Sequence, residues 1–317
     1  MADIFNSSIG VTMSNISDIS RIQSIGCEQR ICEIAELAER AAASSADMIK
    51  DGVHIYEMLV ALSEEYRSID TDIHAEALLE NKERLSFYNG RLSLMDKAYF
   101  SELYSDALKK NNVTLSEEDF LPAVSSAETF VYVKNIYADE AYDVFTQDFE
   151  DPRVQYAKNF KEAVGLVDTG TVTYCLLPLE ERGARLATVA ELLYRSELKI
   201  NSVIPVFGID GSADIKYALV SRGYTVPKKS PDDDRYLEIR LAAQSDLSLS
   251  ELLCVAESYG IQIYRVNTLS FSTDEGKNDY YSVVFSGENV DFTTLLVFLT
   301  LFSADYTAIG IYKNLES

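Results

Sequence analysis

The sequence has few of the residues from which most catalytic and metal centres are built. Its 317 residues include two histidines, His54 and His74, and four cysteines spread over the chain. A phosphate-binding loop, a dinucleotide-binding glycine fingerprint and a clustered set of metal ligands are also absent from the sequence. Four scattered cysteines do not make a disulfide framework in a chain of this size. We therefore expect no metal and no cofactor.

Positive charge is also scarce. Lys and Arg number 28 against 51 Asp and Glu, which gives a formal net charge of −23. Such a balance argues against nucleic acid or an anionic membrane surface as a partner. Residues 1–10 lack the basic start and long apolar run of a secretion signal, and the apolar segment 295–302 is too short to span a bilayer. We expect a cytoplasmic protein that binds neither nucleic acid nor membrane.

The first region of the chain, residues 1–127, is predicted to be helical. Apolar residues recur at helical spacing from Ile31 to Ala41, and further helical runs cover residues 73–92 and 93–110. Pro122 and the serines that follow it indicate a linker. We expect an all-helical first domain.

Strands and helices then alternate, which is typical of an α/β domain, predicted here over residues 128–243. A strand, a helix and a strand over residues 154–177 predict a parallel sheet, and ligands bind beyond the carboxyl ends of such strands. The segment at that end is Pro178-Leu179-Glu180-Glu181-Arg182. A strand is then predicted over residues 199–207 and a helix over residues 214–220.

Residues 244–317 are predicted to form a separate α+β domain. From Asp246 the pattern gives helix, strand, strand, helix and strand, with a polar hairpin loop over residues 273–278.

The α/β region resembles the prephenate dehydratase family, which has the periplasmic-binding-protein-like fold of two lobes. Pro178 and Glu180 match the family's Pro-Ile-Glu-Asn-Ser, in which Glu181 and Arg182 replace the asparagine and serine. The family's Thr-Arg-Phe strand reads Asp234-Arg235-Tyr236 here. The resemblance therefore implies Glu180, Glu181, Arg182 and Arg235 as substrate-binding residues and Asp234, at the family's threonine, as the catalytic acid.

Two departures from the family concern the ligand-facing parts. The family's glycine-rich loop after the first strand is replaced by the glycine-free residues 134–139. The interval from Arg182 to Asp234 is 234 − 182 = 52 positions, about half of the family's. We therefore expect a shortened second lobe and an altered site.

The C-terminal region resembles the ACT domain that follows prephenate dehydratases, a ferredoxin-like fold. Residues 256–263 carry the closest part of this resemblance. The family's phenylalanine-binding positions correspond to Leu247 and Leu249 at the first helix and to Asn267 and Thr268 after the first long strand. Because ACT domains usually pair, the resemblance implies a homodimer.

Three functions follow as alternatives. The first is a non-catalytic regulatory or ligand-binding protein of aromatic amino-acid (L-phenylalanine) biosynthesis, with prephenate, phenylalanine or a similar aromatic molecule as ligand. The second is an active prephenate dehydratase, a carbon–oxygen lyase that converts prephenate to phenylpyruvate, with or without an N-terminal helical chorismate mutase such as some relatives carry. The third is a purely structural dimeric protein.

Overall fold

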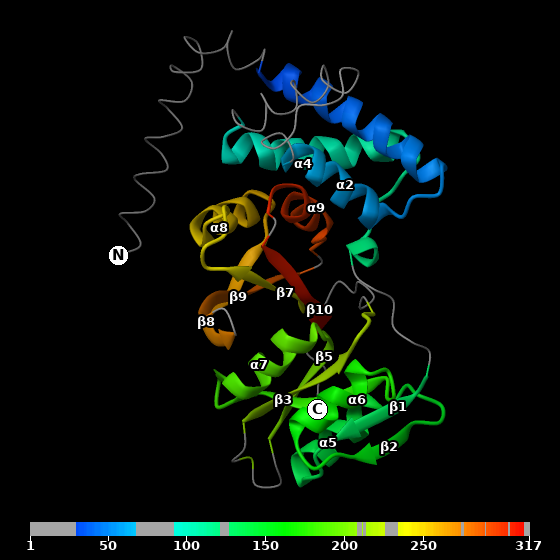
Figure 1. The fold of residues 1–317 in the computed structure, drawn as a ribbon, viewed down its shortest axis with the longest axis vertical. Helices are drawn as coiled ribbons and strands as arrows, with labels where there is room; N and C mark the ends of the chain where they lie inside the picture. The colour runs from blue at the N-terminus through cyan, green and yellow to red at the C-terminus, as the bar shows by residue number, and fades with distance from the viewer. Residues whose placement is uncertain are drawn as a thin grey trace.

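A computed structural model gives the fold of most of the chain. It describes residues 30–67, 92–120, 127–207, 211, 214–225, 234–273, 276–288, 290–303 and 305–313. The helical run expected over residues 73–92 lies outside the described residues. Figure 1 shows three units stacked along the long axis: helices at one end, an antiparallel sheet with two helices in the middle, and an α/β unit at the other end.

The helical unit consists of a helix over residues 30–50 together with α2 (Ile55–Arg67) and α4 (Leu94–Lys110). Helix α4 begins at a capping box, in which the Ser93 and Asp96 side chains each accept a hydrogen bond from the other residue's backbone. These helices do not enclose a core of their own.

One hydrophobic core instead joins these helices to the C-terminal unit. It contains Leu59 and Phe100 from the helical unit and Leu296 from α9 (Thr293–Phe302). The phenol of Tyr259 also donates a hydrogen bond to the Ala98 carbonyl at 2.7 Å. The helical region predicted as a separate domain is thus packed on the C-terminal unit.

The α/β unit contains one six-stranded sheet in the order β2-β1-β3-β6-β5, with β4 paired to β3. Strands β1, β2 and β3 are parallel, whereas β6 runs antiparallel to both of its neighbours. Helices α5 and α6 pack into two different cores, one on each face of the sheet. The elements are β1 (Thr129–Tyr132), α5 (Ile136–Phe145), β2 (Arg153–Tyr156), α6 (Phe160–Asp168), β3 (Tyr174–Glu181), β4 (Ala184–Arg185), α7 (Ala187–Ser196), β5 (Lys199–Val206) and β6 (Ile215–Ser221).

The segment 214–220, expected to be helical, forms strand β6 instead. Residues Tyr217 to Ser221 are buried one after another, because both faces of this strand are covered. A short, continuous apolar run is ambiguous between a buried helix and a buried strand, and here pairing with β3 and β5 decides the outcome.

This strand also corrects the expectation of a shortened second lobe. Strands β5 and β6 complete the first sheet instead of leading into a second one. In the described part of residues 127–225, every strand belongs to this single sheet. The α/β unit is therefore one lobe.

The C-terminal unit has the ferredoxin-like β-α-β-β-α-β order and forms an antiparallel sheet, β10-β7-β9-β8. Strand β7 is hydrogen-bonded to β9 and β10, so the boundary expected at 243/244 would cut this strand from its own sheet. The hairpin strands extend to Thr273 and from Gly276, into the segment expected as a loop. The elements are β7 (Asp234–Ala242), α8 (Leu249–Ser258), β8 (Gln262–Thr273), β9 (Gly276–Glu288) and β10 (Tyr306–Lys313).

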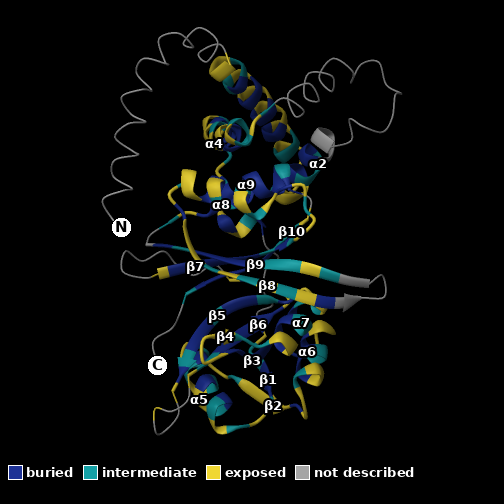
Figure 2. Ribbon diagram, turned by 90° about the vertical axis from the view of Figure 1, so that its left-hand side faces the viewer, coloured by how far each residue is buried: buried dark blue, intermediate teal, exposed yellow. Residues whose placement is uncertain are grey.

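The two faces of the C-terminal sheet are both covered. Helices α8 and α9 lie on one face, and the α/β unit lies against the other, as Figure 2 shows. Tyr236, Val284 and Tyr312 point from the sheet into the core of the α/β unit. Strands β5 and β10 approach so closely that a Cβ built on Gly310 would lie 2.2 Å from the carbonyl oxygen of Ile200. Only glycine fits there.

Candidate functional site

The carboxylate of Glu180, expected to face substrate at the end of β3, is buried between the α/β unit and the C-terminal sheet. It is 7% exposed and pairs with Arg265 of β8. Arg185 and Lys216 also lie 3.9 Å from its oxygens. Three cations from three strands therefore neutralise this carboxylate. Glu180 lies in the interface between the α/β unit and the C-terminal unit.

A second buried carboxylate, Glu238 of β7, lies in the same interface. Arg185 donates a hydrogen bond to its Oε1 at 2.7 Å, and the Tyr312 phenol donates to its Oε2 at 3.1 Å. Ser282 adds a third donor at 3.0 Å. Burial, with the negative charge of Glu238, raises the pKa of Tyr312 well above its usual value, so the phenol keeps the proton that it donates.

Arg182 and Glu181, the other residues expected at the end of β3, lie at an exposed hairpin tip. The register Glu181↔Ala184 leaves Arg182 and Gly183 as a two-residue loop. Their φ angles are 51° and 73°, as a type I′ turn requires. The structure therefore places the Arg182 side chain in solvent and away from Glu180.

Replacing Arg182 with asparagine is expected to raise the free energy of unfolding by about 0.5 kcal/mol, because Asn tolerates a positive φ better than Arg and Asn-Gly is favoured in this turn. Urea denaturation of the Arg182→Asn variant measures the change. A loss of stability or of ligand binding on this substitution would show that the arginine has a role that the exposed turn does not reveal.

Arg235, expected to bind substrate, is the largest fully buried side chain among the described residues. Its two terminal nitrogens donate to the carboxylate of Glu117, which lies in η2 (Glu117–Phe120) of the helical unit. It also donates to the Val290 carbonyl at 3.0 Å, and the backbone of Phe292 donates to Glu117 at 2.9 Å. This ion pair joins the helical unit to the C-terminal unit. Asp234, the expected catalytic acid, is exposed beside it.

The four residues expected to bind a ligand in the C-terminal unit do not converge on a site. Leu247 is buried in the core shared with the helices, and Leu249 packs against that core. Asn267 and Thr268 lie on β8, where they are paired with β9 and Thr268 is exposed. Leu247 therefore contributes to stability, and nothing in its surroundings indicates a ligand.

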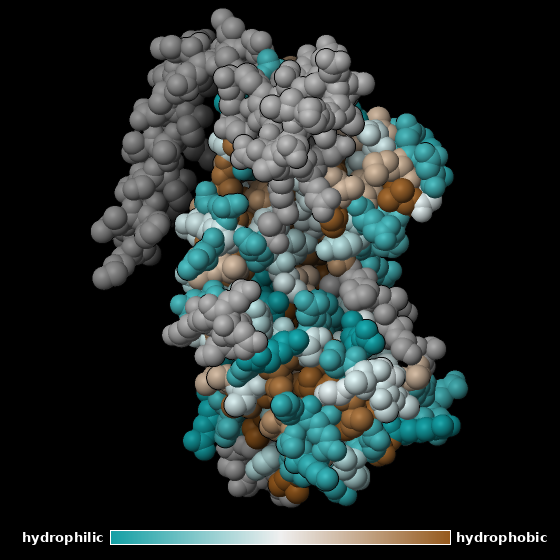
Figure 3. Space-filling view, viewed as in Figure 1, coloured by the Kyte–Doolittle hydropathy of each residue, from teal (hydrophilic) through white to brown (hydrophobic). Residues whose placement is uncertain are grey.

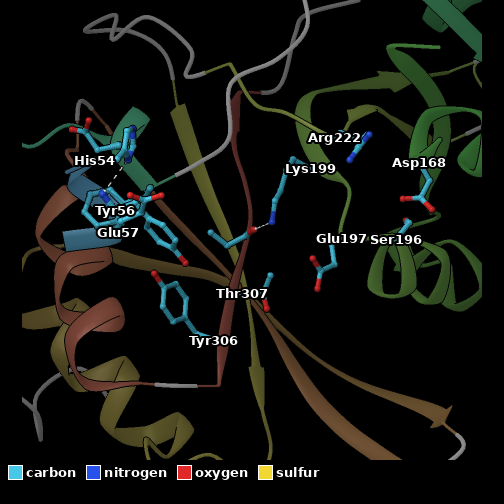
Figure 4. Close-up of a pocket in the computed structure, with 13 residues that line it drawn as sticks. His54, Tyr56, Glu57, Asp168, Ser196, Glu197, Lys199, Arg222, Tyr306 and Thr307 are labelled. Atoms are coloured by element: carbon cyan, nitrogen blue, oxygen red, sulfur yellow. Dashed lines mark hydrogen bonds between the residues drawn. The ribbon is translucent and has the colours of Figure 1, made fainter. Parts of the chain in front are cut away.

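A cleft that the sequence did not indicate lies where the three units meet. Its volume is about 690 Å³, within the range of small-molecule sites. It is lined by His54, Tyr56, Glu57, Asp119 and Phe120 of the helical unit, by Asp168, Ser196, Glu197, Lys199 and Arg222 of the α/β unit, and by Tyr306, Thr307 and Ala308 of β10. Figure 4 shows these side chains approaching a shared space from opposite sides.

The chemical character of the cleft changes from one side to the other. Lys199 and Arg222 bring positive charge from the α/β unit, together with the carboxylates of Asp168 and Glu197. Tyr56 and Tyr306 bring aromatic rings from the opposite side (Figure 4). Such a lining can hold both charges of a zwitterion and an aromatic ring.

Lys199 has the most unusual environment in the cleft. Its Nζ donates a hydrogen bond to the Ala308 carbonyl of β10 at 2.7 Å. The pKa of Lys199 is lowered to about 8, chiefly by burial; the negative charge of Glu197 opposes this shift and the positive charge of Arg240 adds to it. No motif in the sequence marks this lysine, because β5, which it begins, and β10, which accepts its hydrogen bond, are far apart in the chain.

The lowered pKa of Lys199 makes the stability of the fold depend on pH. Its folded pKa of about 8 lies below the unfolded value of 10.5, so the cost of burying the ammonium is complete below about pH 8 and is relieved as the pH rises toward 10.5. Relative to the Lys199→Met variant, the wild-type chain is expected to gain about 2–3 kcal/mol between pH 7 and pH 10.5. Parallel urea denaturation across this pH range tests it, and a constant difference between the two proteins would contradict the assignment.

No group of three or more potential metal ligands is found among the residues that the structure describes. No described helix is long and apolar enough to cross a membrane.

On the face drawn in Figure 3, hydrophobic residues form small patches among hydrophilic ones, as on an ordinary protein surface.

Comparison with known proteins gives similarity at the level of structure. No family model matches the sequence, and no curated protein matches it. The prephenate dehydratase of Streptococcus mutans is 14% identical, with a TM-score of 0.47 and a match over 60% of this chain and 100% of that one. The prephenate dehydratase of Arthrobacter aurescens in complex with L-Phe is 14% identical, with a TM-score of 0.45 and a match over 58% of this chain and 89% of that one. GqqA, described as a novel type of quorum quenching acylase, is 17% identical, with a TM-score of 0.43 and a match over 59% of this chain and 96% of that one.

These structural similarities are distant, with TM-scores below 0.5. At such low identities and TM-scores they assign no residue and no activity, so the geometry of this chain alone decides how its residues are interpreted.

Proposed function

We propose that this chain is a non-catalytic, ligand-binding or regulatory relative of the prephenate dehydratase–ACT proteins, acting in aromatic amino-acid metabolism. One observation carries the proposal. Arg235 and Glu180 are the two charged residues retained at the positions that the resemblance assigns to substrate. Arg235 forms a buried ion pair with Glu117 of the helical unit, and the buried Glu180 pairs with the half-buried Arg265 of the C-terminal unit.

The energetics of these pairs support a structural role. Arg235 is fully buried and Glu117 is 3% exposed, so each charge depends on the other for solvation. Removing one partner from a buried pair costs about 3–5 kcal/mol. A substrate carboxylate that drew Arg235 away from Glu117 would have to offset that cost, and the single lobe offers few further contacts with which to do so.

The ligand we propose is an aromatic amino acid or a similar small zwitterion bound in the cleft between the units. Lys199 and Arg222 suit its carboxylate, Glu57 and Glu197 suit its ammonium, and the tyrosines suit its ring. Because all three units line the cleft, an occupant would stabilise their arrangement, which is how a regulatory ligand acts. A homodimer through the exposed β8 edge remains part of this proposal.

Thermal unfolding with phenylalanine, tyrosine and prephenate tests it, because a ligand that binds the folded state raises the melting temperature. We expect at least one compound to raise it, and the rise to disappear in Arg222→Ala. Arg153→Ala is the matched control, because Arg153 is exposed on β2 and, within the described part of the chain, pairs locally with Asp151. No rise with any compound would favour a purely structural dimeric protein.

An active dehydratase, with or without chorismate mutase activity, is the second candidate. It would use Asp234 to protonate the leaving hydroxyl of prephenate. A general acid needs its proton held near the reacting group. Asp234 is exposed, and the one hydrogen bond that its side chain accepts from a described residue comes from the Tyr236 phenol at 3.5 Å. This environment gives no support for acid catalysis.

A further inference from the structure

Lys199 differs from an ordinary surface lysine in its position and in its partners. It begins β5, and its side chain enters the cleft, where Nζ reaches the Ala308 carbonyl of β10 (Figure 4). That partner is neutral. Of the described carboxylates, none forms an ion pair with Lys199. A buried amine with a neutral acceptor is not held in its charged form as firmly as a paired one.

The charged groups that act on this amine come from two elements, α7 and β7. Glu197 lies at the carboxyl end of α7 and favours the ammonium, whereas Arg240 of β7 disfavours it. Arg240 is itself held in place, because it donates to the Thr307 hydroxyl at 3.2 Å and stacks on the Tyr194 ring at 4.2 Å. The guanidinium therefore stays near the amine. Desolvation is the largest effect and favours the neutral amine, which is the nucleophilic form.

Arg222 is a second cation in the same cleft, and the structure shows no contact with a described residue by which it would stabilise the fold. Arg222 is exposed, and among the residues that the structure describes it has no hydrogen-bond or ion-pair partner. A guanidinium is suited to holding a carboxylate through two parallel hydrogen bonds. The cleft thus combines a nucleophilic amine with a carboxylate-binding group, and Tyr56 and Tyr306 face them across it.

We propose that Lys199 captures a small 2-oxo acid as a reversible imine, with Arg222 holding the acid's carboxylate. The neutral amine, having released its ammonium proton to water, adds through its lone pair to the carbonyl carbon and gives a carbinolamine. The carbinolamine loses its hydroxyl and a nitrogen-bound proton as water, and a carbon–nitrogen double bond forms. No oxidant or reductant takes part, and hydrolysis reverses the step. The aromatic side of the cleft favours a 2-oxo acid with an aromatic side chain.

This covalent site goes beyond the proposed function and does not depend on it. A chain that failed to bind amino acids and failed to turn over prephenate could still form the imine. Conversely, non-covalent binding of an amino acid requires no reactive lysine.

Reductive trapping of the full chain tests the proposal. The protein is incubated with pyruvate or phenylpyruvate and sodium cyanoborohydride, which reduces the imine to a stable amine, and the modified lysine is located by peptide mass spectrometry. We expect modification of Lys199 ahead of the exposed Lys158, with a rate that rises with pH and levels off above about pH 8. Phenylpyruvate is expected to react faster than pyruvate.

Two variants separate the roles of the two residues. Arg222→Ala is expected to slow trapping of both oxo acids about tenfold, the effect of one lost charge-assisted interaction, while leaving trapping of uncharged benzaldehyde unchanged. Lys199→Arg is expected to abolish the preferred modification. Because the modified position is read in the wild-type chain, a folding defect in a variant does not affect the main result. Modification spread over exposed lysines without preference for Lys199 would overturn the proposal.

Discussion

Arg235→Ala is expected to lower the free energy of unfolding by about 3–5 kcal/mol, the cost of leaving one member of a buried ion pair alone. The substitution strands the Glu117 carboxylate between the helical unit and the C-terminal unit, with only the Phe292 backbone amide as a described donor. Urea denaturation followed by circular dichroism measures the change.

Two further variants show whether the loss comes from the pair. In Glu117→Gln combined with Arg235→Met, both charges are removed, so part of the stability lost in either single variant should return. Arg153→Ala, which breaks an exposed pair with Asp151, should change stability by less than about 1 kcal/mol. A small effect for Arg235→Ala itself would mean that this arginine is available for another role.

Gly310→Val is expected to separate the α/β unit from the C-terminal sheet. A Cβ at this position would lie 2.2 Å from the Ile200 carbonyl oxygen, and backbone on both sides prevents a small adjustment. Overpacking of this kind typically costs about 1–3 kcal/mol, and more where main chain must move. Small-angle X-ray scattering and limited proteolysis should show a larger and more easily cleaved protein.

Gly165→Ala is the matched control for that substitution. Gly165 lies inside α6, and a Cβ there would meet nothing within 4 Å. Alanine in place of glycine in a helix is expected to stabilise the chain by about 0.5–1 kcal/mol. If Gly310→Val left the scattering profile unchanged, the close contact between β5 and β10 would not be what holds the units together.

The sequence predicted the elements that have a clear local signal. Helix α6 and the strands β3 and β5 follow from the apolar patterns over residues 154–177 and 199–207. The order of the C-terminal elements was also correct. Strand β6 was not found, because a buried apolar run carries no period of its own. Its pairing with β3, which also removes the expected second lobe, depends on tertiary contacts.

The candidate site was harder to predict, for a physical reason. The resemblance predicted that Arg235 and Glu180 bind substrate, but a sequence does not show which partner a charge will find. Arg235 meets Glu117, 118 positions away. Lys199 meets the Ala308 carbonyl, 109 positions away, and the cleft around it exists only because three units come together.

We infer that Arg235 and Glu180 hold the units together and perform no chemistry. Incubation of the purified chain with prephenate, with phenylpyruvate formation followed over time, tests this most directly. We expect a rate equal to that in buffer, with and without phenylalanine, and the same rate for Asp234→Asn. Turnover of about 1 per second or faster, within the usual range of enzymes and lost in Asp234→Asn, would contradict it.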